Sequence, residues 1–456
     1  MDAGSQVNNQ QDKKLEAPKP QEENGVQVAV VQPAKTLSGK ELKALKKAQK
    51  LAARKARVDA RGPTEAKHGP SDPKQGNTSK KVSNKPAPAA GAQQTNEQAA
   101  EKALFEEKQV SIFSHLDSHR RRNTENAPKD VHPAVFRLGL RLANYQVYGS
   151  NTRCIELLRT FKRVIEDYQT PAGTTISRHL TTHINTQIAY LVSTRPLSIS
   201  MGNAIRFLKL EVSVLGIDLT EDEAKEVLLS KIDSYIRDRI IVAGKVIMQT
   251  ASQKIQDGDV VLTFSNSSTV NQVLIYAKSI GKNFRVIVVD SRPGYEGKQG
   301  VRQLTEHGLS CTYVMLSALA YVMQETTKIF LGGHAMLSNG ALYSRAGTSL
   351  VALMGREANV PVIVCCESYK FSERIQLDSL VFNELASPDQ LVNDSINEPE
   401  KPGALKDWRS VKNLKLLSLK YDVTPPRLIT VCVCEMGLLP STSVPAIINE
   451  FKQIYT

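Results

Sequence analysis

The sequence of 456 residues predicts an α/β fold class in three parts. These are a disordered basic N-terminal tail over residues 1–103, an all-helical domain over 104–256, and a Rossmann-like parallel-sheet domain over 257–456. Three successive residue patterns support this division: a polar, lysine-rich stretch, then apolar residues repeated at helical spacing, then short apolar runs alternating with helical stretches.

The composition fits a globular protein that carries a polar tail. Hydrophobic residues make up 41% and aromatic residues 5%, and the net charge of +13 suggests an acidic partner or nucleic acid. No apolar run approaches the ~20 residues needed to cross a membrane. The six cysteines form no C-x-x-C pair, and the N-terminus has no signal-like apolar core. We therefore expect reduced thiols and a cytosolic protein without a membrane segment.

The tail is too poor in large apolar residues to offset its chain entropy, with one exception. Ser38 and Glu41 have the spacing of a capping box and open a basic helical stretch over residues 38–61. Its apolar stripe is narrow. The stretch is either a solvated, fraying helix or an electrostatic contact with RNA, the ribosome or an acidic protein.

The second part predicts two well-marked helices. Asn151 is expected to cap a helix whose apolar face begins at Cys154 and which ends before Pro171. Thr220 and Glu223 form a capping box at the start of another. His179 and His183 lie four residues apart, but no third ligand is evident nearby, so no metal site is expected.

The third part predicts a parallel sheet covered on both faces, with right-handed crossovers. Helical stretches should begin near Ser268, Gly300, Ser317 and Thr348, and Pro425 and Pro426 should open a further helix. Residues 389–403 are polar and predict a surface loop. The expected strands are DVVLTF from 259, FRVIVVD from 284, CTYVML from 311, KIFLGG from 328 and PVIVCC from 361.

Polar residues gather in three loops that follow neighbouring strands, where α/β sheets bind their ligands. Free N–H groups at a helix start, hydroxyls and arginines all favour an anion such as phosphate. Turn chemistry alone explains the same residues equally well, and both interpretations stay open. The candidates are Ser265, Asn266, Ser267 and Ser268 in the first loop, Arg292, Glu296 and Gly297 in the second, and His334, Asn339 and Arg345 in the third.

Nucleotide-binding loops are absent from the sequence. No G-x-x-x-x-G-K-[ST] and no G-x-G-x-x-G occurs, so no nucleoside triphosphate or dinucleotide cofactor is expected. Cys432 and Cys434 alternate within an apolar run and should belong to the core. The sequence predicts neither a cofactor nor a metal.

Several motifs resemble one family closely, over roughly residues 130–456. That family is the alpha/beta/delta group of eukaryotic translation initiation factor 2B, which is related to ribose-1,5-bisphosphate and methylthioribose-1-phosphate isomerases. The form of the 331–348 motif, the CCESYKF run and the basic N-terminus are typical of the delta branch. The motifs are TFSNSSTV from 263, VVDSRPGYEG from 288, LGGHAMLSNGALYSRAGT from 331, VPVIVCCESYKF from 360 and YDVTPPRLIT from 421.

The resemblance also implies that the chemistry of the isomerases is lost. Those enzymes use a cysteine in the first loop and an aspartate in the third, and here Ser265 and His334 stand at these positions. Serine is the poorer nucleophile unless a base activates it, whereas histidine can shuttle protons. We therefore expect a non-catalytic scaffold that retains a vestigial phosphate or anion pocket.

By resemblance, the chain is a regulatory subunit of the complex that exchanges GDP for GTP on translation initiation factor 2. Its expected partners are a beta subunit in a heterodimer, the alpha, gamma and epsilon subunits, and factor 2 with its phosphorylated alpha subunit. The resemblance places a subunit junction at residues 137–147, although helix core is the alternative for its leucines. The junction residues are Arg137, Leu138, Leu140, Leu142 and Val147.

Two other functions remain as alternatives. The chain could be a sugar-phosphate isomerase that uses Ser265 and His334 in altered roles. It could also be an RNA-binding protein that acts through its basic tail, which predicts binding with a steep salt dependence.

Overall fold

The computed structural model describes residues 107–116, 129–216, 218–392 and 405–455, all within one compact unit. The predicted tail and its basic stretch at 38–61 lie outside the described residues. In the described part of the chain, no helix is both long and apolar enough to cross a bilayer. Helices are followed by a parallel sheet, which confirms the predicted fold class, while the division at 103 and 256 stays a prediction.

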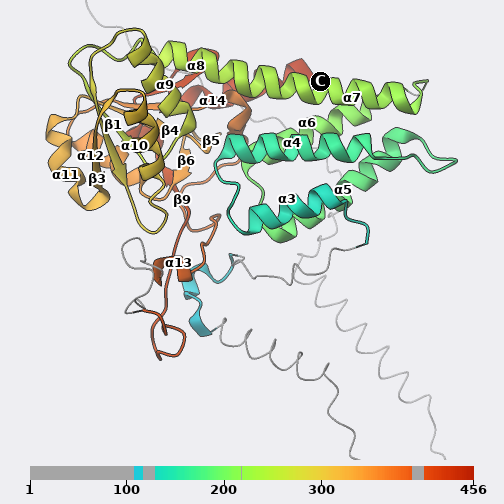
Figure 1. Ribbon diagram of the computed structural model, residues 1–456, viewed down its shortest axis with the longest axis horizontal. Coiled ribbons are helices and arrows are strands. Elements are labelled where there is room, and N and C mark those ends of the chain that lie inside the picture. Colours follow the sequence, from blue (N-terminus) through green and yellow to red (C-terminus); the bar gives the residue numbers. More distant parts are fainter. Residues whose placement is uncertain (1–106, 117–128, 217, 393–404, 456) are drawn as a thin grey trace, which may run out of the picture. The chain divides into compact units, whose positions relative to one another are not determined.

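Helices fill the first half of the described chain (Figure 1). Their buried faces meet in one apolar core that includes Leu157, Phe161 and Leu180. A π-helix continues α7 into α8, which reaches the sheet and packs on α9. The helices are α3 (Pro133–Ala143), α4 (Ser150–Glu166), α5 (Ile176–Thr194), α6 (Ile199–Ser213), α7 (Glu221–Tyr235), the π-helix η2 (Ile236–Val242) and α8 (Ala243–Ser252).

The two predicted helix starts have different outcomes. The capping box of Thr220 and Glu223 is confirmed, with both of its hydrogen bonds present. The predicted cap at Asn151 is wrong, because α4 begins one residue earlier and has Gly149 at its cap. Asn151 instead points its side chain into a polar network described below.

The main sheet has seven strands in the order β11-β10-β7-β4-β1-β2-β3, all parallel except β11. Two apolar clusters cover its faces: α8, α9 and α10 pack on one, and α11, α12 and α14 on the other. The five predicted strands are confirmed to within two residues. The strands are β1 (Val260–Phe264), β2 (Arg285–Asp290), β3 (Ser310–Met315), β4 (Lys328–Gly332), β7 (Val362–Cys365), β10 (Val431–Cys434) and β11 (Gly437–Leu439).

The helices of the sheet region begin close to the predicted points, except at Pro425. The two prolines open only a 3₁₀ turn, η6 (Pro426–Leu428), because β10 starts three residues later and leaves no length for a helix. The stretch near Ser317 is a 3₁₀ turn followed by one helical turn. The helices are α9 (Ser268–Ser279), α10 (Gly297–Glu306), α11 (Leu319–Val322), α12 (Thr348–Glu357), α13 (Asp389–Val392) and α14 (Val444–Tyr455).

A second sheet of four strands was not predicted. The segment after β4, expected as a loop, folds into a hairpin of β5 (Ala335–Leu337) and β6 (Leu342–Arg345). Asn339 and Gly340 make its turn, and Gly340 has the positive φ of 77° that such turns favour. The hairpin is completed by β8 (Phe371–Ser372) and β9 (Tyr421–Thr424) in the order β8-β5-β6-β9. The predicted surface loop at 389–403 begins with α13 and otherwise lies outside the described residues.

Candidate functional site

A cavity of about 390 Å³ opens where β1 and β4 end. Seven of the predicted site residues line it, because the carboxyl ends of neighbouring parallel strands meet at one edge of a sheet. The start of α4 forms part of its wall, so helices and sheet share this cavity. The predicted residues that line it are Ser265, Asn266, Ser267, Ser268, Glu296, His334 and Arg345.

The first loop presents hydroxyls and a helix start to the cavity. The Ser267 hydroxyl accepts the Val270 N–H at 3.5 Å and caps α9. Ser265 has a φ of +59°, and its backbone N–H donates to the Val289 carbonyl at 2.8 Å. The Ser265 hydroxyl donates to Glu296 Oε2 over a long 3.4 Å. A carboxylate, rather than the histidine, is therefore the partner of Ser265.

His334 packs beside two tyrosine rings, Tyr343 and Tyr421, which stack on each other with their centroids 4.8 Å apart. Its ring centroid lies 5.8 Å from that of Tyr343 and 4.5 Å from that of Tyr421. Burial lowers the pKa of His334 well below its ordinary value, and the positive charges of Arg153 and Arg345 lower it further. The imidazole is therefore neutral near pH 7, and protonating it is unfavourable.

Arg345 already has an anion inside the protein. Its Nη2 lies 2.7 Å from Glu296 Oε1, and the two side chains are 21% and 22% exposed. The guanidinium also stands 5.5 Å from the centre of the Tyr421 ring. Arg345, one of the two arginines expected at the anion pocket, is thus paired with a carboxylate from the neighbouring loop.

Three predicted residues lie outside the lining of the cavity. Arg292 is exposed on the second loop. Gly297 is buried where a Cβ would come within 2.7 Å of Asp290 Cγ, so the loop passes too close for a side chain. The Asn339 amide donates to the Gln376 carbonyl at 2.9 Å and accepts the Ala341 N–H, which are contacts of a hairpin turn.

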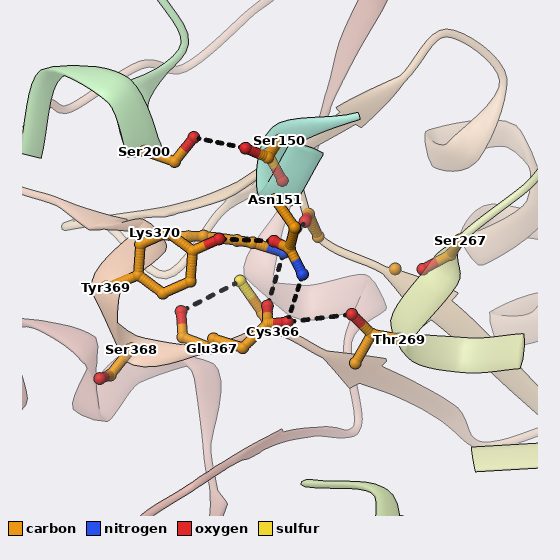
Figure 2. A network of polar contacts seen from close by, with 12 residues as sticks. Ser150, Asn151, Ser200, Ser267, Thr269, Cys366, Glu367, Ser368, Tyr369 and Lys370 are labelled. Atoms are coloured by element: carbon orange, nitrogen blue, oxygen red, sulfur yellow. Dashed lines mark hydrogen bonds and ion pairs between the residues drawn. The ribbon is translucent and has the colours of Figure 1, made fainter. Parts of the chain in front are cut away.

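A buried polar network behind the cavity escaped the sequence analysis (Figure 2). Glu367 and Lys370 bracket a short 3₁₀ turn, η5 (Ser368–Lys370), and Lys370 Nζ lies 2.5 Å from Glu367 Oε2. Glu367 Oε1 accepts hydrogen bonds from Asn151 at 2.9 Å and from Thr269 at 3.0 Å. The Tyr369 hydroxyl donates to the side-chain amide oxygen, Oδ1, of Asn151. One carboxylate therefore ties α4, α9 and η5 together.

The electrostatics of this network favour an ion pair. Burial alone raises the pKa of Glu367, but the Lys370 ammonium and the Asn151 amide outweigh burial and hold the pKa below its ordinary value. The sequence signal that could have identified this network is the run ESYK, which places Glu367 and Lys370 just after a buried strand. Charged side chains are rarely buried unless they are paired.

Asp290 is a second residue that was overlooked. It ends β2, accepts the Tyr313 hydroxyl and the Ser291 N–H, both at 2.9 Å, and packs against Gly297. Burial raises the pKa of Asp290. It fixes both ends of the loop that carries Glu296.

The predicted subunit junction falls on α3 and the turn after it. Leu138, Leu142 and Val147 lie in the core of the chain itself, and the two leucines share one helix face. Arg137 is exposed and Leu140 is half-buried. A junction here stays a prediction and rests on Arg137 and Leu140.

No set of three metal-ligating side chains occurs among the described residues. His179 makes a short hydrogen bond, 2.5 Å, with the Tyr168 hydroxyl, and the ring of His183 packs on the same tyrosine. The two histidines therefore have a packing role on α5.

The comparisons with known proteins agree on one family. The profile of the initiation factor 2 subunit family matches residues 146–441. The chain is 71% identical to the translation initiation factor eIF2B subunit delta of Schizosaccharomyces pombe, over 92% of this chain and 91% of that protein. It is 28% identical to the ribose 1,5-bisphosphate isomerase of Pyrococcus furiosus, over 69% and 93%. The delta-containing crystal structure of the tetrameric eIF2B-beta2-delta2 complex from C. thermophilum matches with a TM-score of 0.64 and 36% identity, over 72% of this chain and 99% of that one.

Proposed function

The chain belongs to the initiation factor 2 subunit family, and we propose that it acts as a non-catalytic regulatory subunit of eIF2B, which promotes GDP/GTP exchange on translation initiation factor 2. High identity to a delta subunit over nearly the whole chain supports this role. The isomerases are far more distant relatives, and the alternative isomerase function is not favoured.

The observation that carries the proposal is the state of the cavity. Ser265 and His334 share no hydrogen bond in the described structure, and Ser265 instead contacts Glu296. A serine nucleophile needs a base within about 3 Å to accept its proton. The arginine that could hold a substrate phosphate is already paired. The Glu296 carboxylate lies a long 3.4 Å from the Ser265 hydroxyl and is paired with Arg345, so it is poorly placed to activate the serine.

The long segment between β8 and β9 is a candidate surface for binding a partner subunit. Together with residues 107–116 it forms what we call the apolar lobe: residues 107–116, 373–392 and 405–420. Its own buried core consists of Phe113, Leu116 and Leu385, which is small for so many residues. The lobe exposes a concentration of large apolar side chains, among them Ile375 (66% exposed), Leu377 (84%), Val381 (55%) and Phe382 (48%).

Polar contacts hold the apolar lobe in place. Lys108 Nζ donates to the Val411 carbonyl at 2.5 Å, and Lys415 Nζ donates to the Gln109 carbonyl at 3.0 Å. Arg409 forms a bidentate pair with Asp389, with distances of 2.6 and 2.8 Å. A fixed surface with this much exposed apolar area is typical of a protein interface. We propose that it contacts the beta subunit, which the related tetramer contains.

The test is co-expression of the full chain with the beta subunit of the same organism, followed by native mass spectrometry. We expect a delta–beta complex that Leu377→Asp weakens at least about tenfold, the scale of one lost hot-spot contact. Val214→Asp is the matched control, because Val214 is also exposed (72%) but lies at the end of α6. Equal assembly of both variants excludes the apolar lobe as the contact surface, and failure of the wild type to bind the beta subunit contradicts the regulatory role.

Finer parts of the role rest on the family resemblance. We propose that the helices contact factor 2 and its phosphorylated alpha subunit, that the alpha, gamma and epsilon subunits complete the complex, and that it works in the cytosol. RNA or ribosome contact through the basic stretch at 38–61 is a further proposal. Deletion of that stretch should abolish RNA binding and its steep salt dependence, whereas unchanged RNA affinity would exclude it.

A further inference from the structure

Both cationic side chains that line the cavity are neutralised from within. Among the described residues that line the cavity, Arg345 and Lys370 are the arginine and lysine side chains. Arg345 pairs with Glu296 at 2.7 Å, and Lys370 pairs with Glu367 at 2.5 Å. The cavity therefore offers hydroxyls, amides and a helix start, but no cation that lacks a carboxylate.

We infer that Glu296 occupies the anion position of this cavity and keeps phosphorylated ligands out. Its carboxylate lies where Arg345 and the Ser265 hydroxyl converge. The start of α9 lines the same cavity through Ser267 and Ser268, and free N–H groups at a helix start attract anions. A phosphate would compete for these donors and would meet a like charge beside Arg345.

Several positively charged side chains lie near Arg345, and the negative charge of Glu296 partly offsets them. Arg345 acts electrostatically on Arg153 and Lys420, and Arg195 acts on both of these as well while pairing with Glu384 at 2.8 Å. Burial and the charge of Arg345 together lower the pKa of Lys420 to about 8, although the charge of Glu296 opposes this shift. Four cations thus face two carboxylates, and without the charge of Glu296 they would face one.

The loop that carries Glu296 is fixed. Asp290 holds its start through the Ser291 N–H and packs against Gly297 at its end, where no side chain fits. Because α10 begins at Gly297, Glu296 is held between a buried carboxylate and a helix. The Glu296 carboxylate is therefore held in a fixed position in the cavity wall. Its proposed effect is on ligand binding in the cavity and does not depend on the apolar lobe.

The test is titration of the full chain with ribose 5-phosphate, followed by calorimetry at constant ionic strength. We expect Glu296→Gln to bind at least about tenfold more tightly than the wild type, the equivalent of about 1.4 kcal/mol. Glu325→Gln is the matched control: Glu325 pairs with Arg285 at 2.6 Å near the start of β2, far along the strands from the cavity. Equal affinity of wild type and Glu296→Gln, or an equal gain in Glu325→Gln, overturns the role of Glu296.

Two further measurements extend the test, and the second keeps it decisive if Glu296→Gln folds poorly, because it uses the wild type. Adding Arg345→Met to Glu296→Gln should abolish the gained binding, since it removes the cation that the phosphate would contact. A crystal of the wild type soaked in ribose 5-phosphate should retain the Glu296–Arg345 pair and show no phosphate on Arg345. Phosphate bound to Arg345 in that crystal contradicts the inference.

Discussion

Two ion pairs of the same cavity differ in how deeply they are buried. The side chains of Lys370 and Glu367 are 4% and 1% exposed, whereas those of Arg345 and Glu296 are 21% and 22% exposed. Glu367 also binds Asn151 and Thr269 and so joins helices that are far apart in the sequence. Glu296 adds only the long contact with Ser265.

The difference separates a structural pair from one that controls the cavity. A buried carboxylate that loses its cation is left in a medium of low polarity, so the first pair should be costly to break. A half-buried pair is partly compensated by water, so the second should be cheaper to break and easier for a ligand to replace.

Lys370→Met should have the largest effect on stability. It leaves Glu367 buried without a cation, and we expect the free energy of unfolding to fall by about 3–5 kcal/mol. Urea denaturation of the full chain measures this change. Glu367→Gln combined with Lys370→Met should recover part of the loss, because it removes the unpaired charge. A single variant within about 1 kcal/mol of the wild type would contradict a structural role for the pair.

Asp422 adds a third case, a half-buried residue whose carboxylate has no ion pair in the described structure. It accepts the Gly347 and Ser349 N–H groups at 2.7 and 2.9 Å at the start of α12, and burial raises its pKa to about 7. Because the pKa of Asp422 is higher in the folded than in the unfolded protein, its contribution to stability is complete below the unfolded-state pKa. That contribution is lost as the pH rises to the folded-state pKa. Between about pH 4 and 7, stability should therefore fall by up to about 1.4 kcal/mol per pH unit.

The measurement is the free energy of unfolding as a function of pH for the wild type and for Asp422→Asn. The asparagine oxygen can still accept both N–H groups but cannot ionise, so this part of the slope should vanish. An identical slope in both proteins would show that Asp422 is ionised throughout the range.

Glu296→Gln should have the smallest effect on stability of the three. We expect a loss of about 1–2 kcal/mol, between the values for exposed and buried pairs. Glu325→Gln, whose pair is 43–44% exposed, should cost about 0–1 kcal/mol. Thermal and urea denaturation of both variants compare them directly. A loss as large as that of Lys370→Met would remove the distinction between the two pairs.

Most of the sheet could be predicted because its strands are buried on both faces. Runs such as Val260–Phe264 and Val362–Cys365 are continuously apolar and have helices between them. The second sheet could not be predicted, since β8 has two residues and the β5–β6 hairpin pairs with β8 and β9 only through contacts far apart in the sequence. Its Asn339–Gly340 turn was visible, but the same dipeptide also occurs in open loops.

The lining of the cavity could be predicted in part for the same reason. Ser265 and His334 follow neighbouring strands β1 and β4 of the main sheet, so the topology brings them together. The pairing of Arg345 with Glu296 depends on side-chain distances between two loops, which spacing along the chain does not contain. Asn151 was taken for a helix cap because its position in the sequence fits one. Its contacts with Glu367 and Tyr369 lie more than two hundred residues away.

A turnover assay with ribose 1,5-bisphosphate tests the non-catalytic cavity most directly. The full wild-type chain, purified with its partner subunits, should show no isomerisation above that of His334→Ala. Glu296 beside Arg345 and a neutral His334 without a hydrogen bond to Ser265 are the physical reasons. Sustained isomerisation by the wild type that is lost in His334→Ala would contradict a regulatory subunit without chemistry of its own.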